Sequence, residues 1–518
     1  MHKLLKGSFI ILIGTIIFRI GGYLFVVLTQ SLLGIQGYGM LSLVMSFQWI
    51  LILIAVAGLP PAIAKYVSEY LAKDDKFMVK QVIKTSFKIM LAMSLIFTTV
   101  FYFLATPLAN FFHGGPEVAI LFQAVSFIAP FSVILGLFRG VFQGYQRMTD
   151  IMVTRAVEQI FMISMAVVFI LAGFYVLGAV IGTLIGFGIA SLSALLIFKF
   201  YLWDGLKDVK KPIISVNESQ LAKKLLIFSS PIIITGLAEL TLFQTGNFII
   251  PYFMNFTSLG YYNIASPIAR LPLIISSSVA VALLPAASEA LALNSGNLVK
   301  KYVIHSYRYL LIVLLPLCAI VIILGLPIMN LLFPKAPLAY SFAGTALSIL
   351  VIGMAFFSVY GISASVLQAA GKPYPAMFFL AIGTASNLIL TVILVPMFGL
   401  NGAAIATMLA SLMVMVLTTS KTIKVTNTKL PYLNLLKITF SSFIIGLCLL
   451  LVPKTIPGLL ISLLLVPIIY ILLLGFTRAL EMRDLLILNK LGYRLGPLSN
   501  PIMKFTGFLQ RFIKENDQ

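Results

Sequence analysis

The chain alternates between long apolar stretches and short polar segments rich in Gly, Pro, Lys or Asp. Each apolar stretch has about 20 residues or more, the length that an α-helix needs to cross a hydrocarbon core roughly 30 Å thick. We therefore predict an all-α polytopic membrane protein with fourteen transmembrane helices. Their approximate ranges are residues 8–33, 38–64, 83–108, 118–144, 151–173, 176–201, 222–250, 257–286, 302–332, 338–369, 374–396, 400–424, 433–452 and 457–478.

Composition agrees with this pattern. Of the 518 residues, 60% are hydrophobic and only 10% are charged, whereas soluble domains carry roughly 25% charged residues. The two cysteines, Cys318 and Cys448, lie inside apolar stretches, and the three histidines are scattered. The sequence therefore indicates neither a disulfide framework nor a metal site.

The basic residues that give the chain its net charge of +21 are distributed as expected for a membrane protein. If the N-terminus is cytoplasmic, 32 of the 36 Lys and Arg residues fall in cytoplasmic segments and two, Lys335 and Lys454, fall outside. This is the bias that the positive-inside rule describes. We predict a cytoplasmic-membrane protein with both termini in the cytoplasm, and the dispersed charges do not indicate a nucleic-acid partner.

An internal repeat divides most of the chain into two halves. Short similar segments recur at an offset of 223 to 225 residues, in the pairs Gly37 and Gly260, Pro60 and Pro285, Gln143 and Gln368, and Gly178 and Gly402. Because six helices separate the copies, both enter the membrane from the same side, which makes them parallel repeats. We expect two pseudo-symmetric six-helix lobes.

The repeat sets the predicted domain boundaries. They are an N-lobe at residues 1–202, a cytoplasmic linker at 203–221, a C-lobe at 222–428, two appended helices at 429–480, and a basic amphipathic tail at 481–518 that lies on the membrane.

Several segments together resemble a known transporter family. They are "KGSFIILIGTIIFRIGGYLF" at the start, "GLPPAIAKYVSEYLA", "FRGVFQGYQRM" and "GLNGAAIATMLA". The chain resembles the polysaccharide-biosynthesis branch of the multidrug, oligosaccharidyl-lipid and polysaccharide flippase superfamily, which includes O-antigen-type flippases and proteins similar to stage V sporulation protein B. The resemblance implies two lobes around a central cavity that opens alternately to each side. It also implies a transporter, not an enzyme, that exports a polyprenyl-diphosphate-linked oligosaccharide.

Two arginines, Arg19 and Arg270, lie deep within predicted helices. A cation at that depth costs at least about 2.5 to 3.5 kcal/mol unless it is compensated. Since a guanidinium binds phosphate bidentately and stays charged when buried, we predict that both arginines bind the diphosphate. Pro267 and Pro272 flank Arg270 and should break the helix there. The alternative is that each arginine pairs with an internal acid or carbonyl and holds helices together.

Two acids have open roles. Glu239, near the middle of a predicted helix, would either bind Na⁺ or H⁺ as a coupling ion or serve as the counter-ion of an arginine. Glu158 has the same two candidate roles, ion coupling or counter-ion, if it faces the cavity; the alternative is a solvated helix end near Arg155. No cofactor other than such an ion is expected.

Five amide side chains lie within the predicted helices and are candidates for sugar contacts, with interhelical hydrogen bonding as the alternative. They are Gln48, Gln123, Asn247, Asn263 and Asn387.

Rival functions differ in what they require. The chain has no Walker A sequence or nucleophile elbow, and a membrane glycosyltransferase or polymerase usually needs a larger extramembrane loop. A multidrug antiporter and a lipid II-type flippase of the same superfamily stay open. Because both lobes lie in one chain, we expect a monomer surrounded by membrane lipids.

Overall fold

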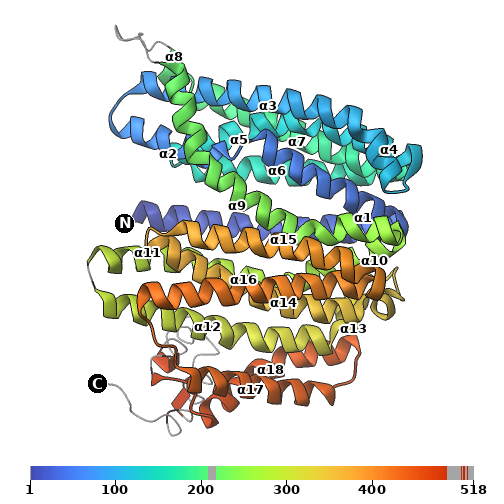
Figure 1. Cartoon of the computed structure of the whole chain (residues 1–518), viewed down its shortest axis with the longest axis vertical. Helices are drawn as coiled ribbons and strands as arrows, with labels where there is room; N and C mark the ends of the chain where they lie inside the picture. Colours follow the sequence, from blue (N-terminus) through green and yellow to red (C-terminus); the bar gives the residue numbers. More distant parts are fainter. Residues whose placement is uncertain are drawn as a thin grey trace. The chain divides into compact units, whose positions relative to one another are not determined.

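Helices make up the whole regular structure of the described chain, and no strand occurs in it. The structure, a computed structural model, describes residues 2–207, 217–293, 295–482 and 484–486, together with 503, 506, 507 and 510; the side chains of residues 2–19, 281, 282 and 292 are outside the description. This confirms the all-α class. The elements (Figure 1) are α1 His2–Ala55, α2 Leu59–Ala72, α3 Lys76–Phe111, α4 Gly115–Ser126, α5 Ile128–Gly144, α6 Met148–Phe169, η1 Ile170–Phe174, α7 Tyr175–Tyr201, α8 Asp204–Lys207, α9 Glu218–Phe253, α10 Phe256–Ala269, α11 Pro272–Ala292, α12 Gly296–Ile323, α13 Gly325–Leu332, α14 Ala339–Ala369, α15 Pro373–Phe398, α16 Leu400–Thr426, α17 Tyr432–Leu450 and α18 Ile456–Phe476.

Twelve helical runs among the described residues are long and apolar enough to cross a membrane. Two of them, Ile20–Ala72 and Met148–Tyr201, each contain two of the fourteen predicted helices. A straight helix of 54 residues would be about 80 Å long at about 1.5 Å per residue, far more than a bilayer needs. Each run has a glycine with positive φ, Gly34 at 70° and Gly173 at 93°, where the helix is interrupted. The twelve runs thus correspond to the fourteen predicted helices, and the number of crossings stays a prediction.

Three predicted helices are each divided in two. Residues 118–144 form α4 and α5, residues 257–286 form α10 and α11, and residues 302–332 form α12 and α13. Hydropathy does not detect these breaks, because the residues at the junctions are themselves apolar or flanked by apolar residues. The predicted tail at 481–518 lies largely outside the described residues.

Glycines bring α6 and α7 into close antiparallel contact. A Cβ atom on any of three α7 glycines would overlap atoms of α6, so that only hydrogen fits there. Such small residues let helix backbones approach in membranes. The three glycines and the α6 residues that face them are Gly178 with Phe169, Gly182 with Ala166, and Gly186 with Met162.

The sequence repeat has the same local geometry in both copies. After α5, the Arg147 N–H donates to the Phe142 carbonyl at 2.8 Å; after α14, the Lys372 N–H donates to the Leu367 carbonyl at 2.9 Å. Gln146 and Gly371, one residue earlier in each turn, both have positive φ, at 58° and 67°. The predicted repeat is therefore present in the backbone of these turns.

A second pair of matching turns lies before α7 and α16. Tyr175 and Gly399 both have positive φ, at 49° and 58°. Gly402 then packs against the Leu394 carbonyl, as Gly178 packs against the end of α6. Glycine is needed at both contacts because the neighbouring backbone occupies the place of a side chain.

The chain forms two compact units, residues 1–264 with 380–406 (the first unit) and residues 265–379 with 407–518 (the second unit). The predicted lobe boundaries at 1–202 and 222–428 stay predictions. Within the first unit, α1 crosses α10 closely: a Cβ on Gly39 would overlap the Phe256 carbonyl, and one on Gly260 would overlap the Ile35 carbonyl. Gly39 and Gly260 belong to the second predicted helix of each half, residues 38–64 and 257–286.

In the second unit, a fully buried arginine binds the segment after α18. Arg308 of α12 forms an ion pair with Asp484 and donates to the Ala479 carbonyl at 2.8 Å. Tyr309 also donates to Asp484, at 3.1 Å, and Glu481 lies 3.3 Å from Arg308. The charge count assigns Arg308 to a cytoplasmic segment, which stays a prediction; its side chain is 0% exposed.

The Gly39→Ala substitution tests the α1–α10 crossing. We expect it to lower stability by about 1 to 3 kcal/mol, because the added methyl group meets backbone atoms that cannot move aside. Thermal unfolding in detergent measures the effect. Gly22→Ala is the control: no atom lies within 4 Å of its added Cβ, so the unfolding temperature should stay the same or rise. Equal effects of the two substitutions would contradict the close crossing.

Asp484→Asn tests the buried ion pair of the second unit. It leaves the Arg308 charge without its main counter-ion, which costs about 3 to 5 kcal/mol for a buried pair. Glu481→Gln is the matched control, because the Glu481 side chain is 32% exposed and a partly exposed pair contributes at most about 1 kcal/mol. Unfolding scans that rank Glu481→Gln as the more harmful substitution would refute this description.

Candidate functional site

Arg270 lies at the junction where α10 ends and α11 begins. Its backbone N–H donates to the carbonyls of Ser266 and Pro267, both at 3.2 Å, and its own carbonyl accepts from Leu273 at 3.0 Å. The bonds to Pro267 and from Leu273 span three residues, so the junction is a tight turn that keeps these groups bonded. The helix is interrupted between the flanking prolines, but the predicted loss of local backbone hydrogen bonding does not occur at Arg270. The Arg270 side chain is partly buried, and its role in diphosphate binding stays a prediction.

Arg19 belongs to α1, but its side chain lies outside the described residues. The prediction that it meets the same anion as Arg270 therefore stays a prediction.

Two of the predicted sugar-contacting amides take part in a hydrogen-bond chain inside the first unit. Asn263 of α10 donates to the Asn247 side chain of α9 at 2.9 Å, and Asn247 donates to Ser46 of α1 at 2.8 Å. Asn247 also donates to Gln244 at 2.7 Å, and Tyr38 donates to the Asn263 carbonyl at 3.4 Å. This chain connects three helices, which is the interhelical alternative for these amides.

The other three amides lie at separate places in the same unit. Asn387 of α15 is fully buried and donates to the Leu242 carbonyl of α9 at 2.7 Å. Gln48 of α1, 2% exposed, accepts from Thr183 of α7 at 3.5 Å. Gln123 of α4 is partly buried. The side chains of Asn387 and Gln48 therefore form hydrogen bonds to neighbouring helices, and the sugar-binding roles stay predictions.

Glu158 forms a buried ion pair. Its carboxylate lies 2.6 Å from the Arg139 guanidinium, and the Arg139 Nε donates to Thr154 at 3.1 Å. The Glu158 residue is only 5% exposed, so the solvated helix end considered from the sequence is wrong. Such a pair compensates both charges inside an apolar bundle.

Glu239 is on α9, two turns before the hydrogen-bond chain that begins at Gln244 and Asn247. Its side chain is exposed at the surface of the described chain and has an interaction with other groups. Both roles predicted for it, ion coupling and counter-ion, stay predictions.

Sequence reasoning missed Arg139 and Ser46. The charge count places Arg139 among topology-setting residues, although Arg139 follows about three helical turns of α5 and precedes Glu158 by only 19 residues. A basic residue so far inside an apolar helix, with an acid on the next helix, is the signal that could have revealed the pair. Ser46 gives no such signal, because a serine between apolar residues is common in membrane helices.

Two family models match the chain. The one described as polysaccharide biosynthesis protein matches residues 4–291, and the one described as MatE matches residues 231–393. The first covers more than half of the chain.

Curated relatives include two Bacillus subtilis proteins of similar length. The lipid II flippase MurJ is 23% identical over 442 residues, which are 79% of this chain and 80% of MurJ. Stage V sporulation protein B is 26% identical over 428 residues, 78% of this chain and 80% of that protein. A probable low-salt glycan biosynthesis flippase of Haloferax volcanii, Agl15, is 28% identical over 162 residues, 31% of this chain and 34% of Agl15.

Solved structures share the fold. The inward closed conformation of the lipid II flippase MurJ has a TM-score of 0.73 at 18% identity and covers 92% of this chain and 99% of its own. An inward-facing multidrug transporter of the MATE family has a TM-score of 0.67 at 16% identity, covering 79% and 95%.

A double-mutant cycle tests the Arg139–Glu158 pair. Glu158→Gln alone should lower stability by about 3 kcal/mol, because it leaves a poorly solvated guanidinium without its counter-ion. Adding Arg139→Gln should return part of that loss, since the two positions are coupled. Glu69→Gln, in a solvent-exposed pair with Lys73, should change stability much less than Glu158→Gln, because water screens an exposed pair. Additive effects of the two substitutions in unfolding scans would show that the pair is not a unit.

Proposed function

This chain belongs to the polysaccharide biosynthesis protein family, within the multidrug, oligosaccharidyl-lipid and polysaccharide flippase superfamily, and from that premise we propose that it flips a lipid-linked glycan across the membrane. It is a multi-pass membrane transporter and not an enzyme. The cargo we propose is a polyprenyl-diphosphate-linked oligosaccharide, moved by alternating access of two lobes across the cytoplasmic membrane. Both termini lie in the cytoplasm in this proposal.

The position of Arg270 carries the proposal. Placing a guanidinium at a helix break inside an apolar protein has a large free-energy cost unless an anion or another group compensates its charge. A lipid diphosphate supplies about two negative charges and the planar oxygen pairs that a guanidinium binds bidentately. The interruption of the helix is a second argument. At membrane depth, the backbone leaves the helical conformation mainly where other protein groups or a water-filled cavity can form hydrogen bonds with it. Arg19 would supply the second cation.

The relatives support a lipid-linked cargo but not a particular glycan. MurJ is named for lipid II, and Agl15 is named for glycan biosynthesis. One name refers to a lipid and the other to a glycan, and a lipid-linked glycan agrees with a cationic group for the lipid phosphate and neutral amides for the sugar.

A multidrug antiporter is the second candidate, because the MatE family model and a MATE structure match this chain. An exporter of organic cations needs acids where the cargo binds. Glu158, however, is already paired with Arg139, so Glu239 is the acid on which this candidate depends. Coupling to Na⁺ or H⁺ through Glu239 belongs to this proposal as well.

Reconstitution in liposomes tests the proposal. A fluorescent polyprenyl-diphosphate sugar is placed in both leaflets, and a membrane-impermeant quencher measures how fast it changes sides. Arg270→Ala should slow flipping roughly tenfold or more, because a charge-assisted hydrogen bond contributes about 1.5 to 3 kcal/mol. Lys454→Ala, at an exposed residue, should flip at the wild-type rate.

Two results would contradict the proposal. One is no flipping by the wild-type protein, and the other is an unchanged rate in Arg270→Ala. If the same liposomes instead transport a fluorescent organic cation in response to a Na⁺ or pH gradient, and Glu239→Gln abolishes that transport, the antiporter replaces the flippase.

A further inference from the structure

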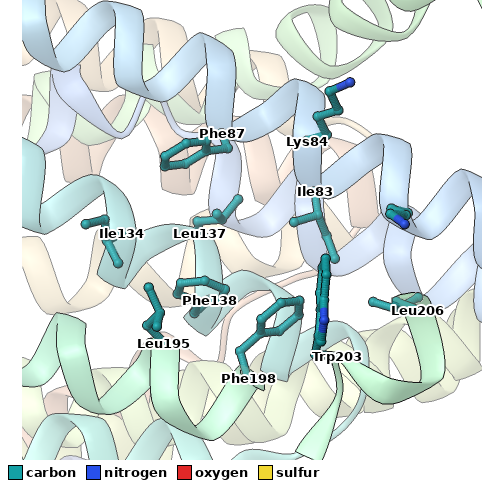
Figure 2. A pocket seen from close by; sticks show the side chains of 11 residues that line it. Ile83, Lys84, Phe87, Ile134, Leu137, Phe138, Leu195, Phe198, Trp203 and Leu206 are labelled. Carbon is teal, nitrogen blue, oxygen red and sulfur yellow. The ribbon is translucent and has the colours of Figure 1, made fainter. Parts of the chain in front are cut away.

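An apolar pocket of about 360 Å³ lies in the first unit between α3, α5, α7 and the short α8 (Figure 2). This volume falls within the range of about 300 to 1,000 Å³ typical of ligand pockets. Its walls are formed mainly by aromatic and aliphatic side chains, among them Phe87, Leu137, Phe138, Leu195, Phe198 and Trp203. Such a lining suits a hydrocarbon chain and offers few bonding groups to a polar metabolite.

Two lysines of α3, Lys80 and Lys84, complete the lining. Lys84 is exposed and interacts electrostatically with Glu218, whose ion pair is with Lys88. In Figure 2 the Lys84 ammonium group extends away from the apolar side chains below it. Lys80 lies 5.5 Å from the Trp203 ring centroid and donates to the Lys207 carbonyl at 3.3 Å. The pocket therefore has a cationic edge beside an apolar interior.

The pocket also borders the surface that faces the bilayer. Leu195 lines it and is 41% exposed, and the neighbouring Leu192 and Phe200 of α7 are exposed as well. Trp203, also 41% exposed, is the amphipathic residue type that gathers where acyl chains meet head groups. A ligand can therefore enter from the membrane, with its apolar part below Trp203 and its charged part at the lysines.

We infer that this pocket binds an anionic glycerophospholipid, with an acyl chain among Phe87, Leu195 and Phe198 and the phosphate at Lys84. Basic pockets between transmembrane helices bind anionic head groups in this manner. The site is distinct from the diphosphate site proposed around Arg270, which belongs to the second unit. The bound lipid would anchor Trp203 and α8, where the predicted linker begins, to α3.

Photocrosslinking tests the inference. The full-length protein is placed in phosphatidylcholine vesicles that contain phosphatidylglycerol with a diazirine on one acyl chain, and mass spectrometry locates the label after illumination. We expect labelling to concentrate on the α5 and α7 segments that line the pocket. Unlabelled phosphatidylglycerol should compete with the probe, and added phosphatidylcholine should not.

Single substitutions test the acyl-chain part and the phosphate part of the site separately. Leu195→Trp fills the mouth of the pocket and should remove most of the labelling, whereas Leu192→Trp, on the same exposed helix but outside the lining, should leave it unchanged. Lys84→Gln should lower labelling about fivefold, the effect of one lysine near an anionic lipid. Lys223→Gln, an exposed lysine of α9, controls for net charge.

Three outcomes would overturn the inference. They are equal labelling by phosphatidylcholine and phosphatidylglycerol probes, equal effects of Leu195→Trp and Leu192→Trp, and displacement of the probe by a polyprenyl diphosphate in preference to phosphatidylglycerol. Because the readout is labelling, a failure of the proposed flippase activity would leave this result unaffected.

Discussion

Buried polar groups in this protein depend on other helices for their compensation, because a bilayer offers them neither water nor counter-ions. Arg308 shows the constraint most plainly, since its fully buried guanidinium is bound by an acid, a carbonyl and a second acid from one segment beyond α18. Arg139 and Glu158 meet the same constraint across α5 and α6. Each pair joins a particular pair of elements, so the compensation of charge also specifies which elements pack together.

Much of the fold could be predicted because its signals are local. Apolar length predicts helices, and the prolines around Arg270 predict the break between α10 and α11. The repeat offset predicts that the turns at Gln146 and Gly371 match, and their backbones do match, with positive φ at both. Gly182 lies where α6 and α7 come into close contact. In each case the residues that carry the signal also form the structure.

The polar contacts could not be predicted, because helical periodicity tells which face a residue occupies but not which helix lies opposite. For Asn247 and Asn263 the sequence therefore leaves two roles open, sugar binding and interhelical hydrogen bonding, and the structure shows the two side chains bonded to each other. The positive-inside count has a similar limit, because it considers only the side of the membrane on which a basic residue lies. It does not reveal that Arg308 pairs with Asp484, 176 residues later. For Arg270 the sequence predicts an interruption of the backbone, whereas diphosphate binding by its side chain stays a prediction.

The central claim is that Arg270 recognises the phosphates of a lipid. It is tested most directly by calorimetric titration of the wild-type protein and Arg270→Gln, each with a short polyprenyl diphosphate and with the corresponding polyprenyl alcohol. The account predicts that the wild-type protein prefers the diphosphate by roughly tenfold or more, and that the substitution reduces this preference without changing affinity for the alcohol. An identical preference in both proteins would contradict it.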